Sequence, residues 1–136
     1  IKMVEIKSNK STISKASIEV FDYLSVPANY QVLMPSKVRS FEATTDTAKL
    51  DIEGIGVVEL AITERTSPTK IVMVPQNKVP FKFDIQWNIV FVDENTSEVE
   101  AIINADLNFM MKMMAENLLA DFLNVQVHKL SEYLKV

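Results

Sequence analysis

The sequence has 136 residues, of which 48% are hydrophobic, and it contains no cysteine. This length is close to the commonest size of one domain, so we expect residues 1–136 to form a single domain with one core. No apolar stretch approaches the roughly 20 residues that a membrane span needs, which excludes a membrane span. The lack of cysteine, with no sign of a secretion signal, indicates a cytoplasmic protein and excludes thiolate chemistry and sulfur-bound zinc.

The formal net charge is −4, from 14 basic and 18 acidic residues. An acidic protein binds nucleic acid only through a concentrated basic face. The best candidate is the beginning of the chain, which carries Lys2, Lys7, Lys10 and Lys15. These lysines are spread out with no aromatic residues between them, which is typical of a solvated surface. No nucleic-acid partner is therefore predicted.

The N-terminal part of the chain is predicted to hold one strand and two short helices. Residues 1–7 place apolar side chains among charged ones, which indicates a strand, and residues 9–11 supply a turn. Residues 16–24 have apolar side chains at helical spacing. Pro27 is well placed to begin a second helix, which Pro35 then ends.

The middle of the chain is predicted to form antiparallel strands, because apolar and polar residues alternate there with period two. The clearest stretch runs from Phe81 to Phe91, and a second one covers residues 98–107. Only the turn at residues 93–95 separates them, so they should form a hairpin. Short turns divide the preceding region into antiparallel strands near residues 37–44, 47–53, 57–66 and 70–75.

A long helix is predicted from about Phe109 to Lys135, since this segment contains no glycine or proline. It is the only predicted element with enough apolar surface to cover one face of the sheet. One broad stripe is expected to face the sheet, formed by Met111, Met114, Ala115, Leu118, Leu119, Phe122, Leu123, Val125, Leu130, Tyr133 and Leu134.

A segment near the N-terminus is similar to the one that opens the polyketide cyclase/dehydrase-like branch of the START and Bet v 1-like (SRPBCC) superfamily. It reads Val20-Phe21-Asp22-Tyr23-Leu24-Ser25-Val26-Pro27 and continues through Tyr30, Leu33, Met34 and Pro35. One departure is Val26, where that branch often has Asp. The order of elements also resembles the helix-grip fold of this superfamily. The resemblance implies an α+β fold in which a curved antiparallel sheet of about seven strands grips a long C-terminal helix around an apolar cavity.

The leading hypothesis is that the chain binds a hydrophobic or amphipathic small molecule, lipid-like or polyketide-like, without chemistry of its own. The ligand would lie between the sheet and the long helix, in a space of the order of 300 Å³. No cofactor is predicted. The expected lining residues are Tyr30, Met34, Phe83, Ile85, Trp87, Met111, Met114, Leu118 and Phe122.

Four methionines gather where the long helix begins, and methionine adapts to irregular apolar surfaces. Met111 and Met114 fall on the predicted core stripe, whereas Met110 and Met113 fall off it. An exposed pair of this kind indicates a subunit contact, as in a homodimer, or a pocket mouth covered by the helix that begins at Pro27.

The ionisable residues give little support to catalysis or metal binding. His128 is the only histidine and lies on the polar side of the long helix, which is typical of a surface residue. Glu98, Glu100 and Asp106 share the outer face of their strand, so no pair of carboxylates is placed inside. No metal site is predicted.

Two alternatives stay open. An enzyme of the cyclase/dehydrase kind needs a polar side chain inside the cup, for which Tyr30, Trp87 and Asn104 are the nearest candidates. An interaction module, as in the chaperone-activating and toxin-like relatives that the resemblance implies, would use the exposed pair Met110 and Met113. A filled interior together with a large apolar surface patch would favour the module.

Overall fold

The computed structural model describes residues 3–135. Its strands and helices follow the predicted order, with one additional strand near the N-terminus. The elements are β1 (Met3–Lys7), β2 (Ser11–Ile13), α1 (Ser17–Leu24), the 3₁₀-helix η1 (Pro27–Leu33), β3 (Val38–Ala43), β4 (Thr47–Ile52), β5 (Gly56–Thr66), β6 (Lys70–Pro75), β7 (Phe83–Asp93), β8 (Thr96–Asp106) and α2 (Phe109–Tyr133).

The strands form one antiparallel sheet in the order β1-β8-β7-β6-β5-β4-β3, and β2 also pairs with β8. β1 lies opposite residues 102–106 of β8, and β2 lies opposite residues 97–99. Together they make one interrupted edge strand. The prediction of a turn at residues 9–11 was therefore wrong at Ser11, which begins β2.

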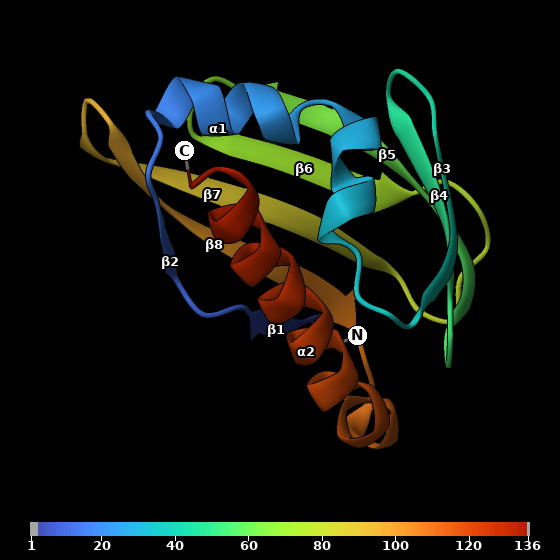
Figure 1. The fold of residues 1–136 in the computed structure, drawn as a ribbon. Coiled ribbons are helices and arrows are strands. Elements are labelled where there is room, and N and C mark those ends of the chain that lie inside the picture. Colours follow the sequence, from blue (N-terminus) through green and yellow to red (C-terminus); the bar gives the residue numbers. More distant parts are fainter. Residues whose placement is uncertain (1–2, 136) are drawn as a thin grey trace.

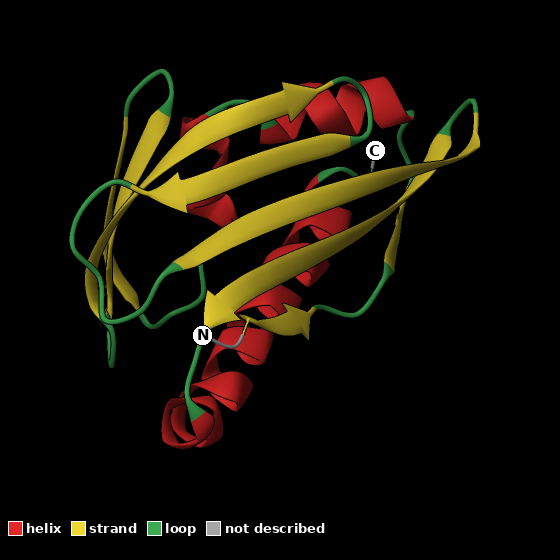
Figure 2. Ribbon diagram, turned by 180° about the vertical axis from the view of Figure 1, so that it is seen from behind, coloured by secondary structure: helices red, strands yellow, loops and turns green. Residues whose placement is uncertain are grey.

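The sheet is strongly curved, and α2 lies across its concave face (Figures 1 and 2). This arrangement confirms the predicted helix-grip α+β fold. Asn108 caps the start of α2, because its side-chain oxygen accepts a hydrogen bond from the Met111 N–H at 2.9 Å. Such a cap satisfies one of the free N–H groups at the start of the helix. Among the described residues, no helix combines the length and the apolar character that crossing a bilayer requires.

The two short N-terminal elements are joined by hydrogen bonds. Tyr30 donates from its hydroxyl to the Leu24 carbonyl oxygen at 2.7 Å. The Tyr23 hydroxyl donates to the Asn29 carbonyl oxygen, and the Asn29 amide donates back to the Tyr23 carbonyl oxygen. These bonds fix η1 against α1 over the end of the sheet that α2 leaves uncovered (Figure 1).

The buried face of α2 differs from the predicted stripe. Met114 and Tyr133 are 78% and 59% exposed, so their predicted place in the core was wrong. The first turns of α2 extend past β1, which forms one edge of the sheet, and none of the described strands lies beneath them (Figures 1 and 2). The side chains that α2 buries are Leu119, Leu123, Gln126, Val127 and Leu130.

Candidate functional site

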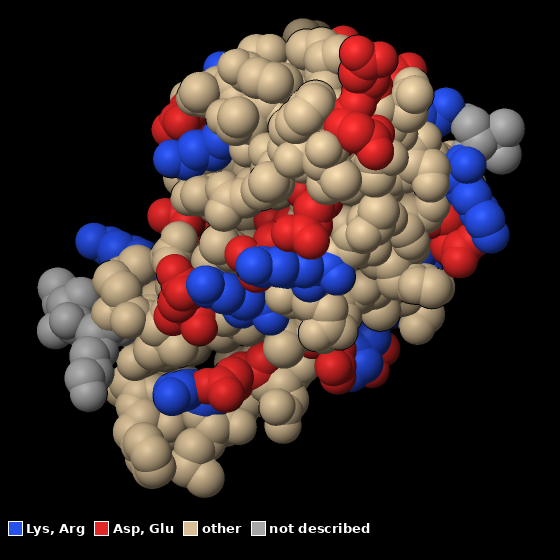
Figure 3. Space-filling model, turned by 90° about the vertical axis from the view of Figure 1, so that its left-hand side faces the viewer, with Lys and Arg blue, Asp and Glu red and all other residues tan. Residues whose placement is uncertain are grey.

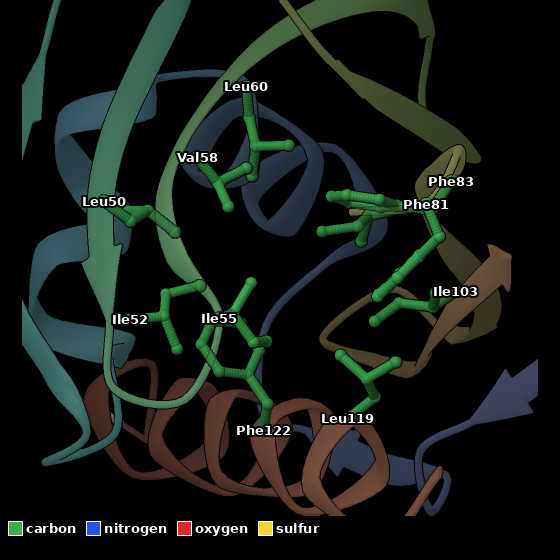
Figure 4. Close-up of a pocket in the computed structure, with 11 residues that line it drawn as sticks. Leu50, Ile52, Ile55, Val58, Leu60, Phe81, Phe83, Ile103, Leu119 and Phe122 are labelled. Atoms are coloured by element: carbon green, nitrogen blue, oxygen red, sulfur yellow. The ribbon is translucent and has the colours of Figure 1, made fainter. Parts of the chain in front are cut away.

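A small cavity of about 30 Å³ lies between the concave face of the sheet and α2. Figure 4 shows that its lining side chains converge from β4, β5, β7, β8 and α2 on one space. The alternation of each strand brings every second residue to this face. The lining residues are Leu50, Ile52, Ile55, Val58, Leu60, Phe81, Phe83, Ile85, Ile103, Leu119 and Phe122.

A cleft of about 180 Å³ lies beside the cavity and opens to the surface. Four residues line both spaces, namely Ile52, Ile55, Leu119 and Phe122. The cleft also has three polar side chains, those of Ser36, Lys37 and Asp121, all of which are exposed. An apolar interior therefore lies next to a polar mouth, and Ile55 and Phe122 are among the side chains between them.

The position of Ile55 depends on the turn between β4 and β5. Gly54 and Gly56 flank it with φ angles of +89° and +103°, a region of backbone conformation that other residues rarely adopt. The Ile55 N–H donates to the Ile52 carbonyl oxygen at 3.0 Å and closes the turn. The two glycines thus allow the turn between β4 and β5 to bend inward, which places Ile55 against α2.

The cavity lining carries no polar or charged side chain. Asn104, one of the three polar candidates, alternates with Ile103 of the lining and donates to Asp84 on the other face of the sheet, at 3.0 Å. The expectation that Asn104 lies inside the cup is therefore wrong. Nothing in the lining could act as a general acid or base.

Tyr30 and Trp87 are buried in the core but do not line the cavity. Their rings meet edge to face, with centroids 6.2 Å apart. Burial raises the pKa of the Tyr30 hydroxyl far above its usual value, because the phenolate would lose its hydration there. Burial also raises the pKa of Tyr23, and the nearby Tyr133 adds to that rise.

The core also holds three buried polar atoms that have no hydrogen-bond partner within residues 3–135, on Ser17, Trp87 and Gln126. Each such atom carries a desolvation cost of about 1–3 kcal/mol if it stays unpaired. None belongs to a residue that lines the cavity or the cleft.

The structure brings together only part of the predicted lining set. Phe83, Ile85 and Phe122 line the cavity, and Leu118 lines the cleft together with Phe122. The other predicted residues lie elsewhere: Met34 and Met111 are half-buried against the core, Tyr30 and Trp87 are buried apart from the cavity, and Met114 is exposed.

Most of the lining was missed by the sequence-based prediction. Leu50, Ile52, Val58 and Leu60 occupy the inward positions of β4 and β5, which the alternation of these strands could have identified. Ile55 carried no such signal, because it lies in a turn and turns are normally expected to face solvent.

The charged surface offers no competing site in the region that Figure 3 shows, where acidic and basic side chains are mixed. His128 is exposed, as predicted. Within residues 3–135, no group of three or more histidine, cysteine or acidic side chains is placed to hold a metal ion.

Comparisons with known proteins place this architecture among solved structures of the START and Bet v 1-like type. No family model matches the sequence, and no curated protein matches it. The protein XoxI from Bacillus cereus is similar over 98% of this chain and 96% of its own, with a TM-score of 0.77 and 14% identity. A START superfamily protein from Mycobacterium smegmatis is similar over 98% of this chain and 97% of its own, with a TM-score of 0.73 and 15% identity. Truncated norcoclaurine synthase from Thalictrum flavum is similar over 98% of this chain and 95% of its own, with a TM-score of 0.77 and 8% identity.

Proposed function

We propose that this chain, which has the helix-grip fold of START and Bet v 1-like proteins, binds an amphipathic small molecule with a slender apolar part. The observation that carries the proposal is the cavity lining, in which eleven side chains converge and none is polar. Affinity at such a site comes from removing apolar surface from water, at about 25 cal/mol per Å². Hydrogen bonds would contribute nothing inside it, so shape and length would select the ligand.

The polar end of the ligand would lie at the mouth of the cleft. Ser36, Lys37 and Asp121 offer a hydroxyl, an ammonium and a carboxylate there, and all three are exposed. Polar groups that stay in contact with water need not lose their hydration when the apolar part enters. This division between an apolar interior and a wet mouth supports an amphipathic ligand.

The present cavity of about 30 Å³ is far below the expected space of the order of 300 Å³. Binding would therefore require side chains to move. Phe122 is half-buried and lines both the cavity and the cleft, so its rotation would join them. In this proposal the bound state is a wider form of the same space.

The test is a titration with straight-chain alkanols and alkanoates of increasing length, followed by calorimetry. Affinity should rise about fourfold for each added methylene, which corresponds to about 0.8 kcal/mol. It should then level off at the chain length that fills the joined space. If no member binds, and native mass spectrometry of the protein from its own host finds no small molecule bound, the proposal fails.

A matched pair of variants locates the site. Val58→Ile adds one methylene to the cavity wall, and a methylene is comparable in volume to the space available. This variant should bind the same series at least about tenfold more weakly, because the added methylene fills part of the interior that the ligand would occupy. Val99→Ile makes the same change at a buried position outside the lining and should leave the affinity unchanged.

The enzyme alternative has less support. A structure of norcoclaurine synthase, which shares the fold, holds dopamine and hydroxybenzaldehyde. The cavity of the present chain lacks any side chain that could move a proton in such a reaction. Binding without catalysis is the simpler proposal.

A second candidate function is that of an interaction module, for which a filled interior and a large apolar surface patch were the expected signs. The patch lies on the projecting start of α2, where Phe109, Met110, Met113 and Met114 are 69–78% exposed. Met110 and Met113 were the predicted interface residues, and we propose that they contact a second copy of the chain.

We also propose a single domain in a cytoplasmic setting, in keeping with the absence of cysteine.

A further inference from the structure

The sheet ends at β1, but α2 continues beyond it. Figures 1 and 2 show from opposite sides that the first turns of α2 project past the outer edge of β1. Below this projection lies a groove of about 290 Å³, lined by Val4 to Lys7 of the strand and by Lys112, Glu116 and Asn117 of the helix. A helix that overhangs the last strand leaves room for one more strand at the spacing of about 4.8 Å that a sheet requires.

Within residues 3–135, no other backbone group pairs with the outer edge of β1. The Ser8 N–H donates to the Ala101 carbonyl oxygen of β8 at 2.8 Å, and the register continues unbroken from Ser8 to Met3. In an antiparallel ladder the N–H and C=O of one residue point to the same side, and the side alternates along the strand. Ile6 therefore faces β8, as Ser8 does, whereas Glu5 and Lys7 direct their backbone groups outward.

The opposite edge of the sheet is better protected. β3 contains a bulge between Val38 and Ser40, and η1 packs against it. β1 has no bulge, no proline and, within the described residues, no element paired with its outer side. Short length and charged side chains protect many sheet edges, and β1 has both, so a strand that pairs with it must match the charges of Glu5 and Lys7.

We propose that β1 pairs with β1 of a second copy, antiparallel and about a two-fold axis, and that the projecting turns of α2 cover the joint. This inference deepens the second-copy contact proposed for Met110 and Met113 and does not depend on ligand binding. The two outward residues of β1 form a salt bridge within the chain, with 3.3 Å between Lys7 Nζ and Glu5 Oε1. Such a strand is neutral overall and does not repel its own copy.

Charge selects the register of the pair. Residues whose backbone N–H and C=O groups point outward must lie opposite each other across the joint. The side chains of two opposed residues then lie on the same face of the sheet. Placing Glu5 opposite the partner's Glu5 would bring two carboxylates together. Placing Glu5 opposite the partner's Lys7 forms two ion pairs by symmetry, so the two-fold axis passes beside Ile6.

The helix supplies the second part of the contact. Met110, Met113, Met114 and Asn117 follow the helical spacing of one stripe, and all four are exposed. The first turns of α2 form the lowest part of the molecule in Figure 1, and the lowest part of the face in Figure 3 shows few charged side chains. Lys112 and Glu116 flank it, with 3.6 Å between Nζ and Oε2, so this surface also carries balanced charge. An apolar stripe with one acid and one base beside it can match a copy of itself.

The test is a charge swap followed by sedimentation velocity at low salt. The native chain should form a dimer, and Glu5→Lys and Lys7→Glu should each weaken it by roughly tenfold or more, because like charges then oppose each other twice. The double variant Glu5→Lys/Lys7→Glu should restore the dimer. Both side chains are half exposed, so circular dichroism should show that all three variants keep the fold.

Hydrogen exchange distinguishes this pairing from any other contact. In the dimer the amides of Glu5 and Lys7 should be protected, and dilution to monomer should expose them, while the amide of Ile6 stays protected throughout. Met113→Glu should weaken the dimer, and His128→Glu, at another exposed position of α2, should not. A native chain that stays monomeric at about 1 mM overturns the proposal, since any dimer would then be weaker than about −4 kcal/mol. A dimer that neither single charge variant weakens also overturns it.

Discussion

Lys129 donates a hydrogen bond from its Nζ to the Met34 carbonyl oxygen at 2.7 Å and so ties α2 to the end of η1. A second bond, from the Asn9 N–H to the Asn124 side-chain oxygen, ties α2 to the segment between β1 and β2 at 2.7 Å. Both bonds lie in the second half of the helix. That half is therefore fixed on two sides, while the first turns extend past the sheet.

Lys129→Met should lower the free energy of unfolding by about 1.5–3 kcal/mol, because it removes a hydrogen bond from a charged donor and keeps the apolar stem. Urea denaturation measures the change. Lys135→Met, at an exposed position, is the control and should change the value by less than about 0.5 kcal/mol. Equal stability of the two variants would mean that the bond contributes nothing.

Tyr30→Phe should make the protein less sensitive to alkali. The folded state holds the Tyr30 proton, since burial raises its pKa above the usual 10.0, whereas the unfolded chain releases it near that value. The stabilising effect is complete below pH 10 and is lost above it, by up to about 1.4 kcal/mol per pH unit. The variant should show a shallower decline above pH 10 in urea titrations.

Tyr30→Phe also has a cost at neutral pH, where losing the bond to Leu24 should destabilise the fold by about 1 kcal/mol. Tyr133→Phe removes a phenol that is 59% exposed and serves as the control. If both variants decline with pH as steeply as the native chain, Tyr30 is not the group that couples folding to alkaline pH.

Phe122→Ala should join the cavity to the cleft. It should lower the free energy of unfolding by about 2–4 kcal/mol, since the aromatic ring is only partly buried. It should also lengthen the alkyl chain at which affinity levels off in the titration series, because more volume becomes available. Phe91→Ala, at a position that is 67% exposed, should change neither quantity. An unchanged limit on chain length in Phe122→Ala would place the bound chain elsewhere.

Gly54→Ala should destabilise the turn between β4 and β5. A Cβ at this position would meet only Leu118 Cδ2, at 3.9 Å, so the space is sufficient. The cost is instead the backbone conformation at φ +89°, about 1–2 kcal/mol for a residue with a side chain. Chemical denaturation measures it, with Glu53→Ala in the same turn as the control. No difference between them would mean that the turn adjusts its backbone freely.

Much of the fold could be predicted because period-two alternation and helical spacing are strong local signals. The hairpin of β7 and β8 and the start of α2 follow from them directly. β2 was missed because Ser11 to Ile13 is too short to show alternation, and its pairing with β8 joins residues 84 or more positions apart. Local pattern carries no information about such a contact.

The errors at the site have a related cause. A helical wheel assumes that the whole helix lies on the sheet, and it placed Met114 inside although the sheet stops before the helix does. The wheel also left Gln126 outside, yet it is only 3% exposed. Which strand forms the edge, and where the helix crosses it, are properties of the assembled sheet.

One turn of α2 belongs to both surfaces discussed above. Leu118 and Leu119 line the cleft, and Asn117 lines the groove beside β1. A displacement of this turn that admits a ligand would also alter the groove, so the two equilibria would be thermodynamically linked. Such linkage is reciprocal: whatever factor occupancy applies to the dimerisation constant, dimerisation applies to the affinity for ligand. A measurement of how the ligand changes the dimerisation constant would then also give the change in ligand affinity that dimerisation causes.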